Sequence, residues 1–561
     1  MTTHFTRRGF IGAAVAAGTV PLLPLLSAGE ALAAEPSPAP ARARSRRASQ
    51  TIDADLLEVT IPRLHALYDA RKYTATQVTH WYLDRIAKYD RVYRSLLHVD
   101  VAGALATAAA QDAAAKAAGA RFKRSALWGV PIVIKANTSV KGLVTSAGWS
   151  GYLIPGHELI APADAPVVAK LKAAGAIILG QTNMPDFAAS DTNISSAFGR
   201  TGNAYDPRFS PGGSSGGTVT AVTANFCVFG TGTDTSNSIR MPSGTSSVVG
   251  VLPTRGLTSI AGIHPLDWLV DNTGPIARDV TDAAIALDVM AGEDPRDFRT
   301  KGSAALAQPG PYSKFLRPDA LTGKRFGVPA FMLGTAGGPN AARNALPLEP
   351  DARELFMHAV DGFRLAGATV VFDDALLTES FLELVRTIKT QPYTAEGVES
   401  FFRDFGPAEY HSPAEYARAV GSPLPFLRGA PASASRPIES DPAADATFWQ
   451  PQRAALAAYE DTLKRFQLDG LVYPAAQMPP NDELLPLREG RRSGGPHSET
   501  GWVNPIGVPA IVVPGGFYAS GLPFGIEVSG RRWKDGDLIG WAFAYEQATR
   551  YRKPPTLKDG R

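Results

Sequence analysis

The 561-residue sequence has a single cysteine, Cys227, and only nine histidines. One cysteine excludes an intrachain disulfide and any metal cluster built from several cysteines. Cys227 lies in a mostly apolar run of small residues, which favours a buried core position over a reactive thiol. The sequence also lacks an HExxH motif or a paired His/carboxylate motif. We therefore expect neither a metal nor another cofactor.

A strong excess of either charge is missing as well. The chain has 56 lysines and arginines against 53 aspartates and glutamates, a net charge of +3. This balance gives no electrostatic signature for binding nucleic acid or anionic membranes, so we expect no nucleic-acid partner. A content of 44% hydrophobic and 19% charged residues is typical of a globular protein with a sizeable core. Nothing in the composition specifies an oligomeric state.

The first fifty residues resemble a targeting segment and a spacer rather than part of a fold. Residues 6–11 (TRRGFI) resemble a twin-arginine export motif, and residues 31–33 (ALA) fit an A-x-A cleavage site. We predict a signal peptide at 1–33 and a disordered linker at 34–50, with export to the periplasm or the extracellular space. The apolar run at 9–26 is short and interrupted by two prolines, so we expect no stable membrane anchor.

Two serine-bearing loops flank a mostly apolar run at residues 218–230. The first loop is GGSSGG at 212–217 and the second is TDTSNSIR at 233–240. Glycine beside serine lets the backbone adopt positive φ and approach a substrate closely, as a nucleophile turn or an oxyanion pocket requires. A flexible Gly/Ser linker is the simpler interpretation, but the apolar segments on both sides favour ordered loops.

A third segment, residues 127–135 (LWGVPIVIK), predicts a buried strand that ends on Lys135. A charged group at the end of an apolar strand is uncommon unless it is paired or functional. A surface lysine with an extended side chain is the alternative. Beside two glycine-serine loops, the catalytic interpretation is favoured.

Together these three segments resemble the amidase signature family of serine hydrolases. The matching blocks are PGGSSGG, TDTSNSIRMPS and GVPIVIK, and the separation of 24 positions from Ser214 to Ser238 fits the family spacing. The resemblance implies a catalytic triad of Ser238 as nucleophile, Ser214 as proton relay and neutral Lys135 as base, acting through an acyl-enzyme. In the family the residue equivalent to Ser214 follows a cis peptide bond.

The resemblance also implies a fold. Further matching segments occur at 250–256, 271–278, 468–474 and 504–514. The expected architecture is a single large α/β/α catalytic domain over residues 51–561, with a central mixed, twisted β-sheet covered by helices. Residues 305–450 match poorly and correspond to the variable region that walls the substrate pocket in the family.

The loop before Ser238 carries the remaining expectations. By the resemblance, the backbone N–H groups of Thr235, Ser236, Asn237 and Ser238 line the oxyanion hole. Many family members have Gly-Gly where this chain has Ser236-Asn237, and asparagine tolerates the same left-handed geometry.

Three residues are expected to support the triad without taking part in the chemistry: Ser215, Asp234 and Arg240. Asp234 and Arg240 flank the nucleophile, and we expect an ion pair between them that shapes the loop. Next to Lys135, the family more often has aspartate where this chain has Ala136.

We conclude that the sequence predicts an exported amidase that hydrolyses a carboxylic amide C–N bond. The substrate is expected to be small or oligomeric: an aryl or alkyl amide, a peptide C-terminal amide, or an oligoamide or carbamate. One alternative is an esterase of the α/β-hydrolase type with a histidine base such as His497, because Gly212-x-Ser214-x-Gly216 fits G-x-S-x-G. Others are a glutamine-hydrolysing amidotransferase subunit, or a binding protein without catalytic activity.

Overall fold

The computed structural model describes residues 52–334, 347–422, 424–425, 436–489 and 494–559. The chain divides into two units, residues 1–55 and 56–561. The predicted signal peptide and linker lie outside the described residues, so both stay predictions. All elements below belong to the second unit.

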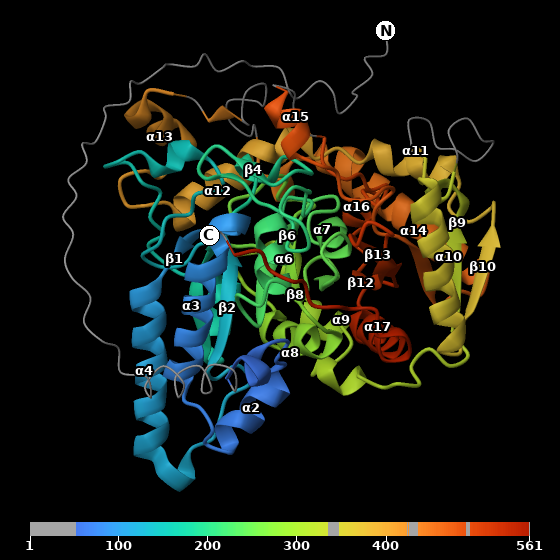
Figure 1. Ribbon diagram of the computed structural model, residues 1–561. Coiled ribbons are helices and arrows are strands. Elements are labelled where there is room, and N and C mark those ends of the chain that lie inside the picture. Colours follow the sequence, from blue (N-terminus) through green and yellow to red (C-terminus); the bar gives the residue numbers. More distant parts are fainter. Residues whose placement is uncertain (1–51, 335–346, 423, 426–435, 490–493, 560–561) are drawn as a thin grey trace, which may run out of the picture. The chain divides into compact units, whose positions relative to one another are not determined.

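An eleven-stranded sheet forms the centre of this unit, in the order β1-β3-β2-β6-β8-β7-β12-β13-β11-β9-β10 (Figure 1). It is mixed: β3, β2 and β6 run parallel, the strands from β6 through β11 pair antiparallel, and β11, β9 and β10 run parallel again. The expected mixed sheet is therefore confirmed. The strands are β1 (Leu96–Val99), β2 (Val130–Lys135), β3 (Ala176–Thr182), β6 (Phe229–Asp234), β7 (Val249–Leu252), β8 (Asn272–Ala277), β9 (Arg325–Pro329), β10 (Thr369–Asp373), β11 (Gly470–Pro474), β12 (Ala510–Phe517) and β13 (Pro523–Ser529). A separate pair is β4 (Ile194–Ser195) and β5 (Gly199–Arg200).

Helices flank the sheet. They are α2 (Ile61–Asp69), α3 (Ala75–Tyr93), α4 (Val101–Ala118), α5 (Pro166–Ala173), α6 (Gly216–Thr223), α7 (Arg240–Gly244), α8 (Val280–Met290), α9 (Ser303–Leu306), α10 (Pro350–Leu365), α11 (Glu379–Thr387), α12 (Thr394–Phe405), α13 (Pro413–Val420), α14 (Gln450–Arg465), α15 (Leu484–Arg488), α16 (Val503–Ile506) and α17 (Asp535–Thr549). Local sequence sets several of their ends: Thr74 and Gln77, for example, form a capping box that begins α3. No helix in the described part of the chain combines the length and the apolar character that a membrane crossing requires.

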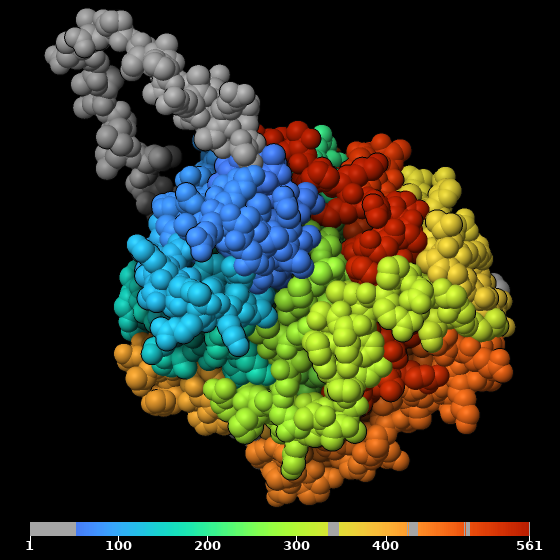
Figure 2. Space-filling model, turned by 90° about the horizontal axis from the view of Figure 1, so that it is seen from below, coloured from blue at the N-terminus to red at the C-terminus, as the bar shows by residue number. Residues whose placement is uncertain are grey.

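Segments far apart in sequence share one face of this unit. Figure 2 shows the blue N-terminal helices beside the red C-terminal segment and the yellow-green region that includes α8. The Ile61 backbone N–H donates to Asp282 Oδ1 of α8 at 2.8 Å, and Arg552 Nε donates to Glu58 Oε2 at 2.7 Å. The second of these contacts joins the two ends of this unit.

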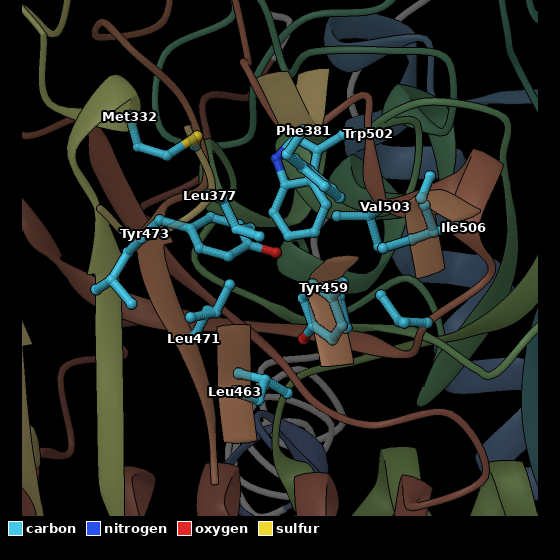
Figure 3. Close-up of a cluster of buried hydrophobic side chains, with 14 of the residues drawn as sticks. Met332, Leu377, Phe381, Tyr459, Leu463, Leu471, Tyr473, Trp502, Val503 and Ile506 are labelled. Carbon is cyan, nitrogen blue, oxygen red and sulfur yellow. The ribbon is translucent and has the colours of Figure 1, made fainter. Parts of the chain in front are cut away.

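An apolar cluster packs α11, α14 and α16 against β11 and the turn that follows β9 (Figure 3). Tyr473 of β11 lies near Trp502, with ring centroids 5.6 Å apart. The Tyr473 hydroxyl donates to Glu527 Oε1 of β13, at 3.1 Å. This contact links the apolar core to the polar region described next.

Candidate active site

Lys135 is the last residue of β2, and it lies where the sheet geometry brings two strand ends together. β2 and its neighbour β6 are parallel, so their carboxyl ends meet at the same edge of the sheet. Thr233 and Asp234 end β6 at that edge. The side chain of Lys135 has 0% exposure. The strand was expected to begin at residue 127. It begins at Val130, because residues 127–129 form a turn.

The first serine loop leads directly into α6, and Ser214 and Ser215 are both fully buried. The peptide bond between Gly213 and Ser214 is cis, as the resemblance implied. Only glycine fits at position 213, because a Cβ atom there would lie 2.3 Å from the backbone oxygen of Thr192. The apolar run between the loops is a helix followed by the strand β6, and Cys227 between them is buried as expected.

The Lys135 amine is surrounded by hydroxyl and carbonyl oxygens. Its Nζ lies 2.8 Å from Ser214 Oγ, 3.0 Å from Ser215 Oγ and 2.8 Å from Thr233 Oγ1. The Ser215 hydroxyl is already committed, since it donates to the Thr233 carbonyl oxygen at 3.2 Å and accepts from the Thr233 backbone N–H at 3.3 Å. Asn137 Nδ2 donates to Thr233 Oγ1 at 3.1 Å. Ser215 can therefore only accept a hydrogen bond from the amine.

Burial lowers the pKa of Lys135 to about 7, although the more distant carboxylates of Asp234 and Asp271 act in the opposite direction. An ammonium group with no carboxylate in direct contact loses its hydration without full compensation, so its neutral form is favoured. Near pH 7 a substantial fraction of the amine thus carries a free lone pair.

Ser238 stands just before α7 and has 5% exposure. Its backbone oxygen accepts a hydrogen bond from the Ser215 N–H at 3.1 Å, which joins the two serine loops. Within the described chain, the backbone N–H groups of residues 235–238 donate no hydrogen bond, whereas that of Ile239 donates to Asp234 Oδ2 at 2.9 Å. Four unused donors in a row are the feature that an oxyanion hole needs.

Arg240 anchors this loop. Its guanidinium, with 0% exposure, donates to Asp234 Oδ2 at 3.1 Å, Glu527 Oε1 at 2.6 Å, the Ser236 backbone oxygen at 2.5 Å and Asn504 Oδ1 at 2.7 Å. The expected ion pair between Asp234 and Arg240 is therefore present. Burial alone would lower the pKa of Arg240, yet the two carboxylates hold it above its ordinary value.

Burial also changes the pKa of the Glu527 carboxyl group. Removal from water raises the pKa of Glu527 to about 7, while the guanidinium of Arg240 opposes this rise. Glu527 is the third charged member of the cluster, and the sequence interpretation did not assign it a role.

Two residues of this region were missed from the sequence. Thr233 could have been found, because it is the first residue of the predicted second serine loop, directly after the apolar run. Glu527 lies 287 positions from Arg240, and no local pattern marks it as a partner.

The alternative of an esterase of the α/β-hydrolase type has no geometric support, because its G-x-S-x-G motif must form a sharp turn known as a nucleophile elbow. An elbow needs a strand immediately before its serine, but residues 201–211 contain no strand. No hydrogen bond links His497 to either serine in the described chain; its backbone oxygen accepts from the Gln477 N–H. Across the same residues, no group of three or more His, Cys, Asp or Glu side chains is placed to hold a metal ion.

Comparison of the sequence and the fold with known proteins identifies relatives of this chain. A family model described as Amidase matches residues 77–539. A glutamyl-tRNA(Gln) amidotransferase subunit from Thermosynechococcus vestitus is 32% identical over 506 residues, covering 87% of this chain and 98% of the relative. The solved structure of peptide amidase from Stenotrophomonas maltophilia has a TM-score of 0.73 and 31% identity, covering 89% of this chain and 99% of its own. An amidase family protein from Bacillus anthracis superposes with a TM-score of 0.72 at 25% identity, covering 91% and 94%.

Proposed function

Because this chain belongs to the amidase signature family, we propose that it is a serine amidase that hydrolyses a carboxylic amide C–N bond through Lys135, Ser214 and Ser238. The observation that carries the proposal is the buried Lys135 amine, 2.8 Å from Ser214 Oγ and with a pKa lowered to about 7. A base poised near neutral pH is what proton transfer in amide hydrolysis requires.

The hydrogen bonds around Lys135 suggest the direction of proton flow. A neutral amine has two N–H donors and one lone pair. Ser215 Oγ and the oxygens of Thr233 can accept the two N–H bonds, which leaves the lone pair for the Ser214 hydroxyl. Ser214 is then able to pass its proton to Lys135 and to take one from Ser238.

In the first half of the reaction, Ser238 Oγ attacks the amide carbonyl carbon. Its proton moves to Ser214 Oγ while the Ser214 proton moves to Lys135 Nζ. The tetrahedral intermediate collapses when the C–N bond breaks, and the leaving nitrogen receives the proton back through Ser214. Water then hydrolyses the acyl-enzyme by the same relay and frees Ser238.

The loop before Ser238 is suited to stabilise the oxyanion. The unused N–H groups of residues 235–238 would donate to the developing negative charge. Arg240 holds the Ser236 carbonyl, and Asn504 Nδ2 holds the Asp234 carbonyl at 2.9 Å, so these donors need little reorganisation during the reaction.

A glutamine-hydrolysing amidotransferase subunit is the second candidate, favoured by relatives that carry this name and match over nearly their whole length. Glutamine brings an α-carboxylate and an α-ammonium group, and each needs an opposite charge at the site. The arginine bonded to this loop, Arg240, already serves two carboxylates. An export signal at residues 1–33 would also separate the chain from cytoplasmic partners. Both points support an exported amidase acting on a neutral amide.

The proposal is tested by peptide-mapped mass spectrometry after treatment with a serine-directed phosphonylating reagent. We expect an adduct on Ser238 in the wild type and strongly slowed labelling in Lys135→Ala. An adduct on Ser214 or Ser215 that is indifferent to Lys135 would overturn the assignment. Turnover of glutamine, but of no simple amide, would favour the amidotransferase instead.

A further inference from the structure

Asn237 differs from every other buried asparagine that the structure describes. It has 1% exposure, and neither its Nδ2 nor its Oδ1 has a hydrogen-bond partner. Each of the other seven buried asparagines uses its side-chain amide in at least one hydrogen bond: Asn137, Asn183, Asn193, Asn203, Asn225, Asn272 and Asn504. Buried polar groups of native proteins are paired with few exceptions, so an exception calls for an explanation.

A loosely held loop does not explain it. The backbone on both sides of Asn237 is fixed: Arg240 binds the Ser236 carbonyl, and the Asn237 carbonyl itself accepts from the Met241 N–H at 2.8 Å. Thr235 Oγ1 donates to Asp271 Oδ1 at 2.5 Å. The backbone that carries the unpaired amide is therefore fixed next to Ser238.

From this we propose that the Asn237 carboxamide binds a second amide group of the substrate, beyond the bond that is cleaved. The inference rests on the proposed function and narrows its substrate class. A carboxamide presents one kind of donor and one kind of acceptor, and an amide group of a substrate carries the complementary C=O and N–H. The scissile amide is engaged with Ser238 and the backbone N–H groups, so the partner of Asn237 is a different amide.

The substrate class that follows is a peptide-like or oligomeric amide rather than a simple alkyl or aryl monoamide. The Asn237 carboxamide is neutral, so it does not favour a charged substituent on the substrate. A site built to hydrogen-bond a substrate group discriminates strongly against an analogue that lacks the group, because the protein atoms are then left buried and unpaired. A monoamide leaves Asn237 in that condition.

The test uses two amides that differ only in the second amide group: N-acetylphenylalanine amide and 3-phenylpropanamide. We expect the wild type to prefer the first. In Asn237→Ala, and equally in Asn237→Gly, the ratio of the two kcat/KM values is expected to fall by about tenfold or more. Asn237→Asp keeps the shape and one acceptor and is expected to lie between these variants and the wild type.

Two further readouts separate failure of this inference from failure of the proposed function. Phosphonylation of Ser238 by a small reagent should still be detected in Asn237→Ala, because the substitution removes the carboxamide and keeps the backbone N–H of residue 237; this labelling also shows that the variant is folded. Protection of Ser238 by each amide reports binding without turnover. If Ser238 is labelled but the ratio and the protection are unchanged in Asn237→Ala, or the wild type does not favour the diamide, the inference is wrong. A bound water that satisfies the amide would give this result. If Ser238 is not labelled at all, the proposed function fails.

Discussion

Two fully buried cations stand at the same edge of the sheet, and their surroundings give them opposite properties. Lys135 is surrounded by neutral oxygens, and burial lowers its pKa to about 7. Arg240 is enclosed by Asp234 and Glu527, whose carboxylates hold its pKa above the ordinary value against the effect of burial. Both side chains are fully buried, so the charge of the nearest partners makes the difference between them.

The difference also explains the choice of side chain. Lysine loses its proton readily when it is desolvated, whereas arginine stays charged under all conditions and offers five donors in a rigid fork. A base that must be neutral for part of the cycle suits the first site. A permanent anchor for the loop before Ser238 suits the second.

The largest effect on activity is expected when Lys135 is replaced. In the proposed mechanism Lys135 is the proton acceptor, so kcat/KM is expected to fall by about 10³-fold or more in Lys135→Ala. Lys135→Arg should not rescue it, because arginine remains protonated. The matched control is Lys170→Ala: Lys170 is partly buried, and its amine donates to the Ala291 backbone oxygen at 2.9 Å, away from the serines. Activity in Lys135→Ala above a tenth of the control would contradict the assignment.

A large loss of stability is expected when Arg240 is replaced. Arg240→Met leaves the carboxylates of Asp234 and Glu527 buried without their cation, and we expect a loss of about 3–5 kcal/mol in the free energy of unfolding. Urea denaturation measures it. Arg317 pairs with Asp319 at the surface, with side chains 66% and 69% exposed, so Arg317→Met should change stability little. Equal losses in the two variants would show that the buried cluster does not hold the loop.

A smaller loss of stability is expected when only the charge of Glu527 is removed. Glu527→Gln keeps an acceptor for Arg240 and for the Tyr473 hydroxyl, and the pKa of Glu527 is already raised to about 7 by burial. We expect a loss of about 1 kcal/mol in the free energy of unfolding, with Ser238 labelling preserved. A loss as large as that of Arg240→Met would mean that the full charge of Glu527 is essential.

Much of the fold and part of this site follow from the sequence. The buried strand ending on Lys135 and the two serine loops were predicted from apolar runs and glycine positions, and the structure brings Lys135, Ser214 and Ser215 into contact. The α/β class and the mixed sheet followed from the resemblance. These features depend on local sequence or on motifs, which a single chain reveals.

Other features depend on contacts between distant segments. Glu527 and Asn504 reach Arg240 only because β13 and α16 pack against α7, more than 260 positions along the chain. Residues 305–450 match the family poorly, yet they contain α13, an eight-residue helix that buries only Pro413 and Tyr416. Two buried positions in so short a helix are too few to reveal a helical period in the sequence.

Whether Lys135 acts as the base can be read from the pH dependence of kcat/KM for amide hydrolysis by the wild type, because this profile reports the protonation of the free enzyme. We expect activity to rise between pH 6 and 8 with an apparent pKa of about 7 and then to level off, as Lys135 becomes neutral. An activity that falls over this range while the protein stays folded, or that rises only toward the ordinary lysine pKa of about 10.4, would contradict it.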